Sequence, residues 1–132
     1  MASSDSKLVE YCKERTGENL RTVARYNTTS ETLTVECVRD DLRSQYTDEQ
    51  YEMLVEKLYD THESVVEIGD KGAPIGDCVS SVHYFENGFV IQLVLDEDDG
   101  YIITFDSVVG SSLASFIEEC LTHAGVPSEL AQ

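Results

Sequence analysis

Positions spaced three and four apart at the start of the chain fall on one helical face, which is apolar apart from its last residue. These positions are Leu8, Tyr11, Cys12 and Arg15. Asp5 or Ser6 can cap the start, and Gly17 can supply a left-handed stop. The pattern predicts a first helix over residues 6–16.

The next two segments alternate with period two. Residues 20–26 and 32–38 are rich in β-branched and aromatic side chains, which predicts two strands, and residues 27–30 between them predict a hairpin loop. The face of the second strand that we expect to be buried carries Leu33, Val35 and Cys37.

The clearest helix start is Thr47-Asp48-Glu49-Gln50, which has the form of a capping box. One apolar face follows it, made of Tyr51, Leu54, Val55, Leu58, Tyr59 and His62. Residues 63–76 contain three glycines and a proline, so we expect a loop there. The apolar stretch 65–68 inside this loop either packs on the domain or extends the helix.

Three strands and a helix complete the pattern. Residues 78–85 and 89–95 flank Asn87-Gly88, the strongest two-residue hairpin signal, and a further strand covers 101–106. The last helix is expected over about 111–124. Ser111 or Ser112 begins it, Gly125 ends it, and its core stripe is Leu113, Phe116, Ile117, Cys120, Leu121 and Ala124.

The predicted element order is therefore α-β-β-α-β-β-β-α. Hairpins connect all the strands whose connections are short enough to judge, so we expect an α+β fold with a five-stranded, mainly antiparallel sheet and three helices packed on it. The length of 132 residues suits a single domain over 1–132, with residues 1–5 and 127–132 as flexible ends.

The charge balance changes the expected environment. The chain has 26 acidic and 9 basic residues, a formal net charge of −17, and the carboxylates are spread along its whole length. Self-repulsion of this size destabilises a compact state in dilute buffer, whereas molar salt screens it. We interpret the composition as an adaptation to a salt-rich cytoplasm; the alternative is an acidic protein that mimics DNA.

The expected compartment is the cytoplasm. The first residues contain no apolar run of the kind found in signal peptides. The longest apolar segment, 89–95, has the length of a strand and not that of a membrane span, so we expect no contact with a membrane. Since the chain has no basic patch, we also expect no binding of nucleic acid.

The element order resembles that of roadblock/LC7-type domains and is close to the longin and profilin arrangement. The stretch VRDDLRSQYTDEQYE and the acidic composition resemble small uncharacterised proteins of halophilic archaea. The second resemblance implies a habitat. The first implies homodimerisation and a scaffold or regulatory role, often beside small GTPases, although no motif of the chain supports the GTPase link.

The acidic run Asp96-Glu97-Asp98-Asp99 followed by Gly100 is the first candidate site. A calcium-binding EF-hand loop needs glycine at position 6 and glutamate at position 12. Counted from Asp96, the glycine here is at position 5 (Gly100) and position 12 is a serine (Ser107), so neither requirement is met. We therefore expect a hydrated turn, in which Gly100 takes the positive-φ position.

Cysteine and histidine give a weaker candidate. Cys120 and His123 lie three apart on the last helix, and Cys12 could approach them if the terminal helices pack side by side. Zinc requires a fuller ligand set, so we expect no metal site. A small enzyme that uses Cys120 and His123 remains an alternative hypothesis. Residues 108–112 could hold an anion at a helix start, but capping explains them better, so we expect no cofactor.

The second helix carries the candidate interaction surface. Asp48, Glu52, Glu56 and Asp60 follow one another at i, i+4 spacing, with Met53 on the same exposed side. Like charges at this spacing cost about 0.2–0.5 kcal/mol per pair in ordinary water. They indicate either a hydrated face in high salt or a docking face for a basic partner. Phe85 and Phe89 join this surface if they face away from the core.

Good core patterning without a catalytic set of residues favours one functional hypothesis. We expect a non-catalytic protein-interaction or regulatory module that forms a homodimer and contacts an unknown protein partner. Two alternatives to this hypothesis are open: a small-ligand sensor with a pocket between sheet and helices, and the small enzyme described above.

Overall fold

A computed structural model describes residues 4–45, 47–96 and 98–125. Within this part of the chain it contains three α-helices, five strands and three short 3-10 turns. The helices are α1 (Ser4–Thr16), α2 (Asp48–Asp70) and α3 (Ser111–His123). The strands are β1 (Leu20–Asn27), β2 (Thr32–Val38), β3 (Ser80–Phe85), β4 (Gly88–Val94) and β5 (Asp99–Phe105). The 3-10 turns are η1 (Gly17–Asn19), η2 (Asp40–Leu42) and η3 (Ser107–Gly110).

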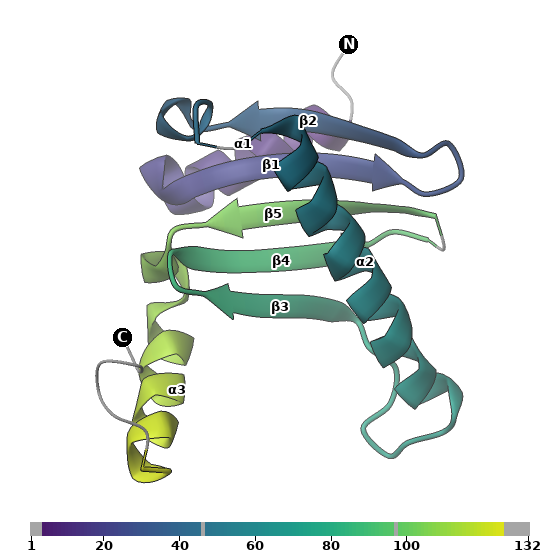
Figure 1. Cartoon of the computed structure of the whole chain (residues 1–132), viewed down its shortest axis with the longest axis vertical. Helices are drawn as coiled ribbons and strands as arrows, with labels where there is room; N and C mark the ends of the chain where they lie inside the picture. The colour runs from purple at the N-terminus through teal and green to yellow at the C-terminus, as the bar shows by residue number, and fades with distance from the viewer. Residues whose placement is uncertain (1–3, 46, 97, 126–132) are drawn as a thin grey trace.

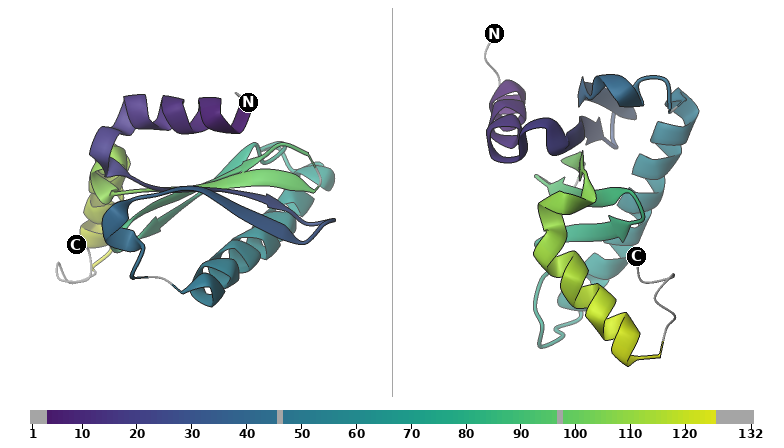
Figure 2. Two further views of the ribbon diagram at one scale, coloured as in Figure 1. Left: turned by 90° about the horizontal axis from the view of Figure 1, so that it is seen from above. Right: turned by 90° about the vertical axis from the view of Figure 1, so that its left-hand side faces the viewer.

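The strands form one antiparallel sheet in the order β2-β1-β5-β4-β3. This confirms the predicted α+β fold and its element order. Helix α2 crosses one face of the sheet and α1 lies on the other (Figures 1 and 2). Helix α3 starts at one end of the sheet and continues past β3, away from the layers (Figure 1).

Each face of the sheet has its own core. Under α2 the buried residues are Ala24, Tyr26, Tyr51, Val55, Leu58, Val90 and Ile102. Under α1 they are Cys12, Leu20, Val23, Tyr101, Ile103 and Phe105. Because side chains alternate along a strand, β1 and β5 contribute to both cores and are buried on both faces.

A β-bulge in β2 corrects the predicted buried face of that strand. Val23 pairs with Cys37 and Ala24 pairs with Val35, so Glu36 is an extra residue. The bulge turns Leu33 toward the core under α2 and Cys37 toward the core under α1. Val35 is exposed, so the prediction of one continuous buried face was wrong.

The capping box of α2 is confirmed. The Thr47 side chain accepts a hydrogen bond from the Gln50 backbone N–H, and Gln50 Oε1 accepts one from the Thr47 N–H. The loop predicted over 63–76 starts only at Lys71, because α2 runs on to Asp70, and of the two alternatives for 65–68 the extension of the helix is confirmed. Its apolar positions keep the helical spacing, and this outweighs the single glycine, Gly69.

The hairpin between β3 and β4 turns one residue earlier than predicted. Phe85 pairs with Gly88, so the two-residue turn is Glu86-Asn87. Gly88 lies in β4, where a Cβ atom would collide with the Phe105 carbonyl oxygen. A glycine is needed at this position because the two strands approach closely there, and not because the backbone takes a positive φ angle.

The ends of the helices differ partly from the prediction. Helix α1 includes Asp5 and Ser6, so neither can cap it from outside, and their side chains lie outside the described part of the chain. Gly17 and Gly125 have φ angles of +56° and +92° and end α1 and α3 as expected. The N-cap of α3 is Gly110, and no serine side chain caps it. The flexible end predicted over 127–132 lies outside the described residues, as do residues 1–3 of the end predicted over 1–5.

The predicted core stripe of α3 was wrong. Ala114 is buried, but Leu113 is 47% exposed and Phe116 is 64% exposed. Cys120 is exposed as well. The helix leaves the end of the sheet at an angle that keeps this stripe off the β-layer (Figure 1).

An ion-pair network joins the ends of β1, β2 and β5. Arg39 Nη1 donates to Asp106 Oδ2 at 2.6 Å, and Arg21 Nη1 donates to Asp106 Oδ1 at 3.3 Å. Arg39 Nε also donates to Asp41 Oδ1 at 2.6 Å, and Arg39 Nη1 donates to the Glu18 carbonyl oxygen at 2.9 Å. The hydrogen bonds from Arg39 and then Arg21 lower the pKa of the Asp106 carboxyl below its usual value.

We expect Asp106→Asn to lower the free energy of unfolding by about 1–2 kcal/mol at neutral pH, because charge-assisted hydrogen bonds to a partly buried carboxylate are lost. A lowered folded-state pKa gives stability that is present above the unfolded pKa of about 3.9 and is lost as the pH falls through the folded-state value. Urea unfolding between pH 7 and pH 3 should show the wild type converging on the variant.

The matched control is Asp40→Asn. Asp40 pairs with Arg43 at 3.3 Å, but its side chain is almost fully exposed, so no measurable change is expected. A constant difference between wild type and Asp106→Asn down to pH 3 would contradict the assignment.

Candidate functional site

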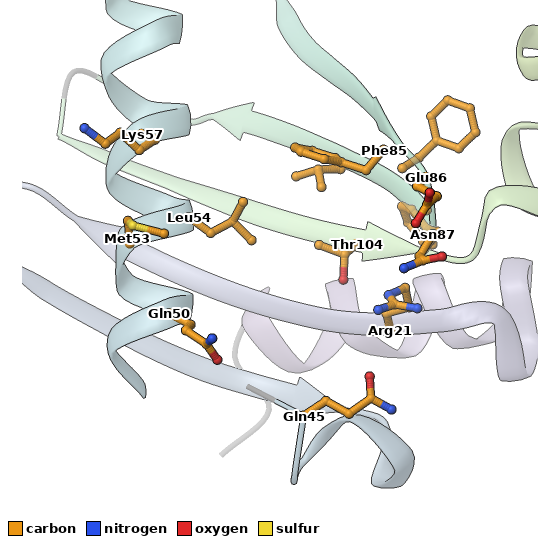
Figure 3. Close-up of a pocket in the computed structure, with 14 residues that line it drawn as sticks. Arg21, Gln45, Gln50, Met53, Leu54, Lys57, Phe85, Glu86, Asn87 and Thr104 are labelled. Atoms are coloured by element: carbon orange, nitrogen blue, oxygen red, sulfur yellow. The ribbon is translucent and has the colours of Figure 1, made fainter. Parts of the chain in front are cut away.

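A groove lies between the first turns of α2 and the β3–β4 hairpin, with a volume of about 610 Å³. Gln50, Met53, Leu54 and Lys57 line it from α2, at the i, i+3, i+4, i+7 spacing of one helical face. The neighbouring face of the helix, with Tyr51, Val55 and Leu58, is buried in the core. The amphipathic pattern of α2 therefore turns one edge of the helix toward the groove (Figure 3).

The opposite wall comes from the sheet. Phe85 ends β3 on the α2 side, and Val90 and Thr104 lie on the same face of β4 and β5. Arg21 of β1 lies beside Asn87 and Glu86 of the hairpin turn at one end of the groove, while Lys57 lies at the other (Figure 3). The floor is thus apolar, and the polar groups stand around it.

Three predicted surface residues meet at this groove. Met53 is exposed and Phe85 is 46% exposed, and both line it. Phe89 also lines it, but it is only 4% exposed and stacks on Tyr84 with the ring centroids 4.7 Å apart. Phe89 is therefore a core residue, whereas Phe85 faces away from the core.

The acidic residues of the predicted surface are elsewhere. Glu52, Glu56 and Asp60 are exposed along α2, and Glu52 lines a second cavity of about 480 Å³ toward β2. Asp48 is the first residue of α2, and its side chain lies outside the described part. Arg21, Gln45 and Asn87 were missed by the sequence analysis, because they come from three separate segments and share no motif.

A polar contact beneath the second half of α2 also has no signal in the sequence pattern. His62 Nδ1 lies 2.6 Å from Ser81 Oγ of β3, and His62 is buried. Cys78 Sγ lies 4.0 Å from the same hydroxyl and donates to the Ser80 carbonyl at 3.4 Å. We interpret the His62–Ser81 pair as a structural contact, since it gives a buried imidazole its hydrogen bond and ties α2 to an edge strand.

The structure does not bring the predicted cysteine and histidine residues together. Cys12 of α1 is buried and lies near Cys37. Burial is the main cause that raises the pKa of the Cys12 thiol, and Cys37 is the second. Cys120 is exposed on α3, and His123 Nδ1 lies 2.8 Å from the Glu119 carbonyl oxygen. Among the described residues, no group of three or more His, Cys, Asp or Glu side chains is arranged to hold a metal ion.

The side chains of the acidic run diverge. Asp96 Oδ1 accepts the backbone N–H groups of Asp98 and Asp99 at 2.9 and 3.0 Å, which shapes the turn between β4 and β5. Asp98 accepts from the Thr28 hydroxyl at 3.2 Å, and Asp99 pairs with Arg25 at 2.6 Å. Glu97 lies outside the described residues.

The predicted positive φ angle of Gly100 was wrong. Gly100 lies in β5, paired with Tyr26 and Val94. A Cβ atom there would collide with the Tyr26 hydroxyl and the Leu93 carbonyl oxygen. The glycine makes room for a buried tyrosine instead of turning the chain.

None of the helices in the described residues combines the length and the apolar character needed to cross a membrane. The family model described as a domain of unknown function (DUF7522) matches residues 6–125, which include all five strands, α2, α3 and all but the first two residues of α1. No curated protein matches the chain.

Proposed function

The chain belongs to the DUF7522 family of domains of unknown function, and we propose that it is a non-catalytic protein-interaction or regulatory module that works as a homodimer in a salt-rich cytoplasm. The observation that carries the proposal is the exposed apolar stripe of α3, with Leu113, Phe116 and Cys120. An exposed, contiguous apolar surface of this kind more often marks a site of protein contact than a helix face that stays in solvent.

The sheet offers a surface that fits this stripe. Helix α1 contacts β1 and β2, so it covers one half of its face of the sheet. On the other half, Ile91 and Leu93 are only partly buried, and Val82 of β3 is exposed. A second copy that places its α3 stripe on this half, in a reciprocal two-fold arrangement, buries both apolar surfaces at once.

The composition supports the salt-rich setting. The formal net charge is −17, and the exposed carboxylates Glu52, Glu56 and Asp60 stand at i, i+4 spacing on α2. Two copies that both carry this charge repel each other in dilute buffer, and molar salt removes most of that repulsion. An apolar interface needs no ion pairs, so the same salt does not weaken it by screening.

We expect light scattering in about 2 M KCl to give the mass of a dimer for the wild type, and that of a monomer for Leu113→Glu/Phe116→Glu. Two charges buried in an apolar contact should weaken association by at least about 100-fold. Circular dichroism checks that the variant is folded.

The matched control is Ser115→Glu, which adds a carboxylate on the polar side of the same helix and should leave the dimer intact. A wild type that stays a monomer at every concentration, or equal dissociation by Ser115→Glu, would rule out this interface.

A small-ligand sensor is the second candidate function. The groove beside α2 favours it, because its volume of about 610 Å³ lies within the usual range of ligand pockets. It also combines an apolar floor with a few polar groups, which is the usual composition of such sites.

A further inference from the structure

We propose that the groove between α2 and the β3–β4 hairpin binds a small organic monoanion with an apolar body, a carboxylate on an aromatic ring being the class that fits. The ring lies on Leu54 and Phe85, and the carboxylate lies by Lys57, whose exposed side chain turns toward the groove from the position in Figure 3, where its ammonium group points away from Leu54. The inference rests on the ligand-sensor function and is independent of the homodimer, which uses α3 and the other face of the sheet.

The charge of the groove is opposite to that of the chain. Acidic residues outnumber basic ones by 26 to 9 overall, yet the lining holds Arg21 and Lys57 against one carboxylate, Glu86. Arg21 is engaged with Asp106 at 3.3 Å, so its charge is largely offset. Glu86 lies with Arg21 at the far end from Lys57 (Figure 3). An anion is therefore favoured at the Lys57 end and opposed over the rest of the surface.

The apolar lining requires a ligand with an apolar body. Leu54 and Val90 form the floor, and Met53 and Phe85 stand exposed at its rims. A ligand that covers Met53 and Phe85 removes apolar surface from water. The flexible thioether of Met53 also contacts aromatic rings favourably, so it can adapt to a flat aromatic ligand. A free inorganic anion would leave this surface wet, so it fits less well than an aromatic carboxylate.

One amide in the lining has a fixed polarity. Gln50 Oε1 accepts the Thr47 backbone N–H at 2.9 Å as part of the capping box, so its remaining side-chain group is the NH₂ donor. The helix start thus fixes a donor one turn from Leu54 and two turns from Lys57. Donors on this wall favour a ligand that accepts hydrogen bonds.

The test uses three probes with one ring system: 2-naphthoate, neutral 2-naphthylmethanol and cationic 2-naphthylmethylammonium. Amide NMR titrations are run at the lowest KCl concentration at which the chain is folded, because salt screens the attraction. We expect saturable shifts at Met53, Lys57, Phe85 and Asn87 with naphthoate. The neutral probe should bind about 5-fold more weakly and the cation more weakly still.

Lys57→Gln separates charge from apolar contact. It should reduce naphthoate affinity about 5-fold, to the level of naphthylmethanol, and leave naphthylmethanol binding unchanged. Lys13→Gln on α1 is the matched control and should change neither. Equal affinity for all three probes at the groove would overturn the monoanion inference while the ligand-sensor function stands. No saturable binding of any probe, or shifts only at Phe116 of α3, would overturn both.

Discussion

In buffer of low ionic strength the chain is expected to lose most of its stability and to regain it in molar KCl. The net charge is −17, and in the described part of the chain Arg21, Arg25, Arg39 and Arg43 form ion pairs with the four aspartates Asp40, Asp41, Asp99 and Asp106. The remaining carboxylates repel over a Debye length of about 30 Å at 0.01 M salt and about 3 Å at 1 M.

The measurement is urea unfolding by circular dichroism between about 0.05 and 3 M KCl. We expect the urea midpoint to rise steeply with salt, because native stability is a difference of only about 5–15 kcal/mol and summed repulsion is a large share of it. An unchanged midpoint across this range would refute the salt-rich setting that we propose.

A single charge reversal on α2 tests the cause. Glu56→Lys places a cation four residues from both Glu52 and Asp60, so two repulsive pairs become attractive. This variant should need less KCl than the wild type to reach the same midpoint. Glu56→Gln, which only removes the charge, should fall between the two; if both variants keep the wild-type salt dependence, repulsion along α2 is not its source.

Ile102→Ala is expected to lower the free energy of unfolding by about 2–5 kcal/mol, because it leaves a cavity in the centre of the sheet. Ile102 is 0% exposed and lies in β5 between β1 and β4, under α2. A loss of this size is enough to unfold a domain of ordinary stability in part.

Ile75→Ala makes the same chemical deletion at a site that is 87% exposed, in the loop after α2. It should change stability by less than about 0.5 kcal/mol. Urea unfolding in 2 M KCl compares the two directly. Similar losses for both would mean that β5 is not at the centre of the core.

Two of the residues chosen from the sequence for an interaction surface, Met53 and Phe85, line one groove. They were selected separately, one as an exposed methionine on an acidic helix and one as an aromatic residue beside a hairpin. The sequence could not join them, because 31 intervening positions separate them and the crossing of α2 over the sheet sets their distance. Arg21 and Asn87 carried no signal for the groove, for the same reason.

Local sequence pattern is sufficient to predict the elements and their order. The Thr47–Gln50 capping box, the period of α1 and α2 and the alternation of β1 depend on residues within about four positions of one another, so local pattern is sufficient to predict them. Which apolar faces are covered depends on how the helices and the sheet pack. The same periodicity that is buried on α2 is exposed on α3, and the bulge at Glu36, the close approaches at Gly88 and Gly100 and the Arg39–Asp106 pair all join residues distant in sequence. Burial is a property of the partner surface as much as of the residue, and that partner is chosen when the layers pack.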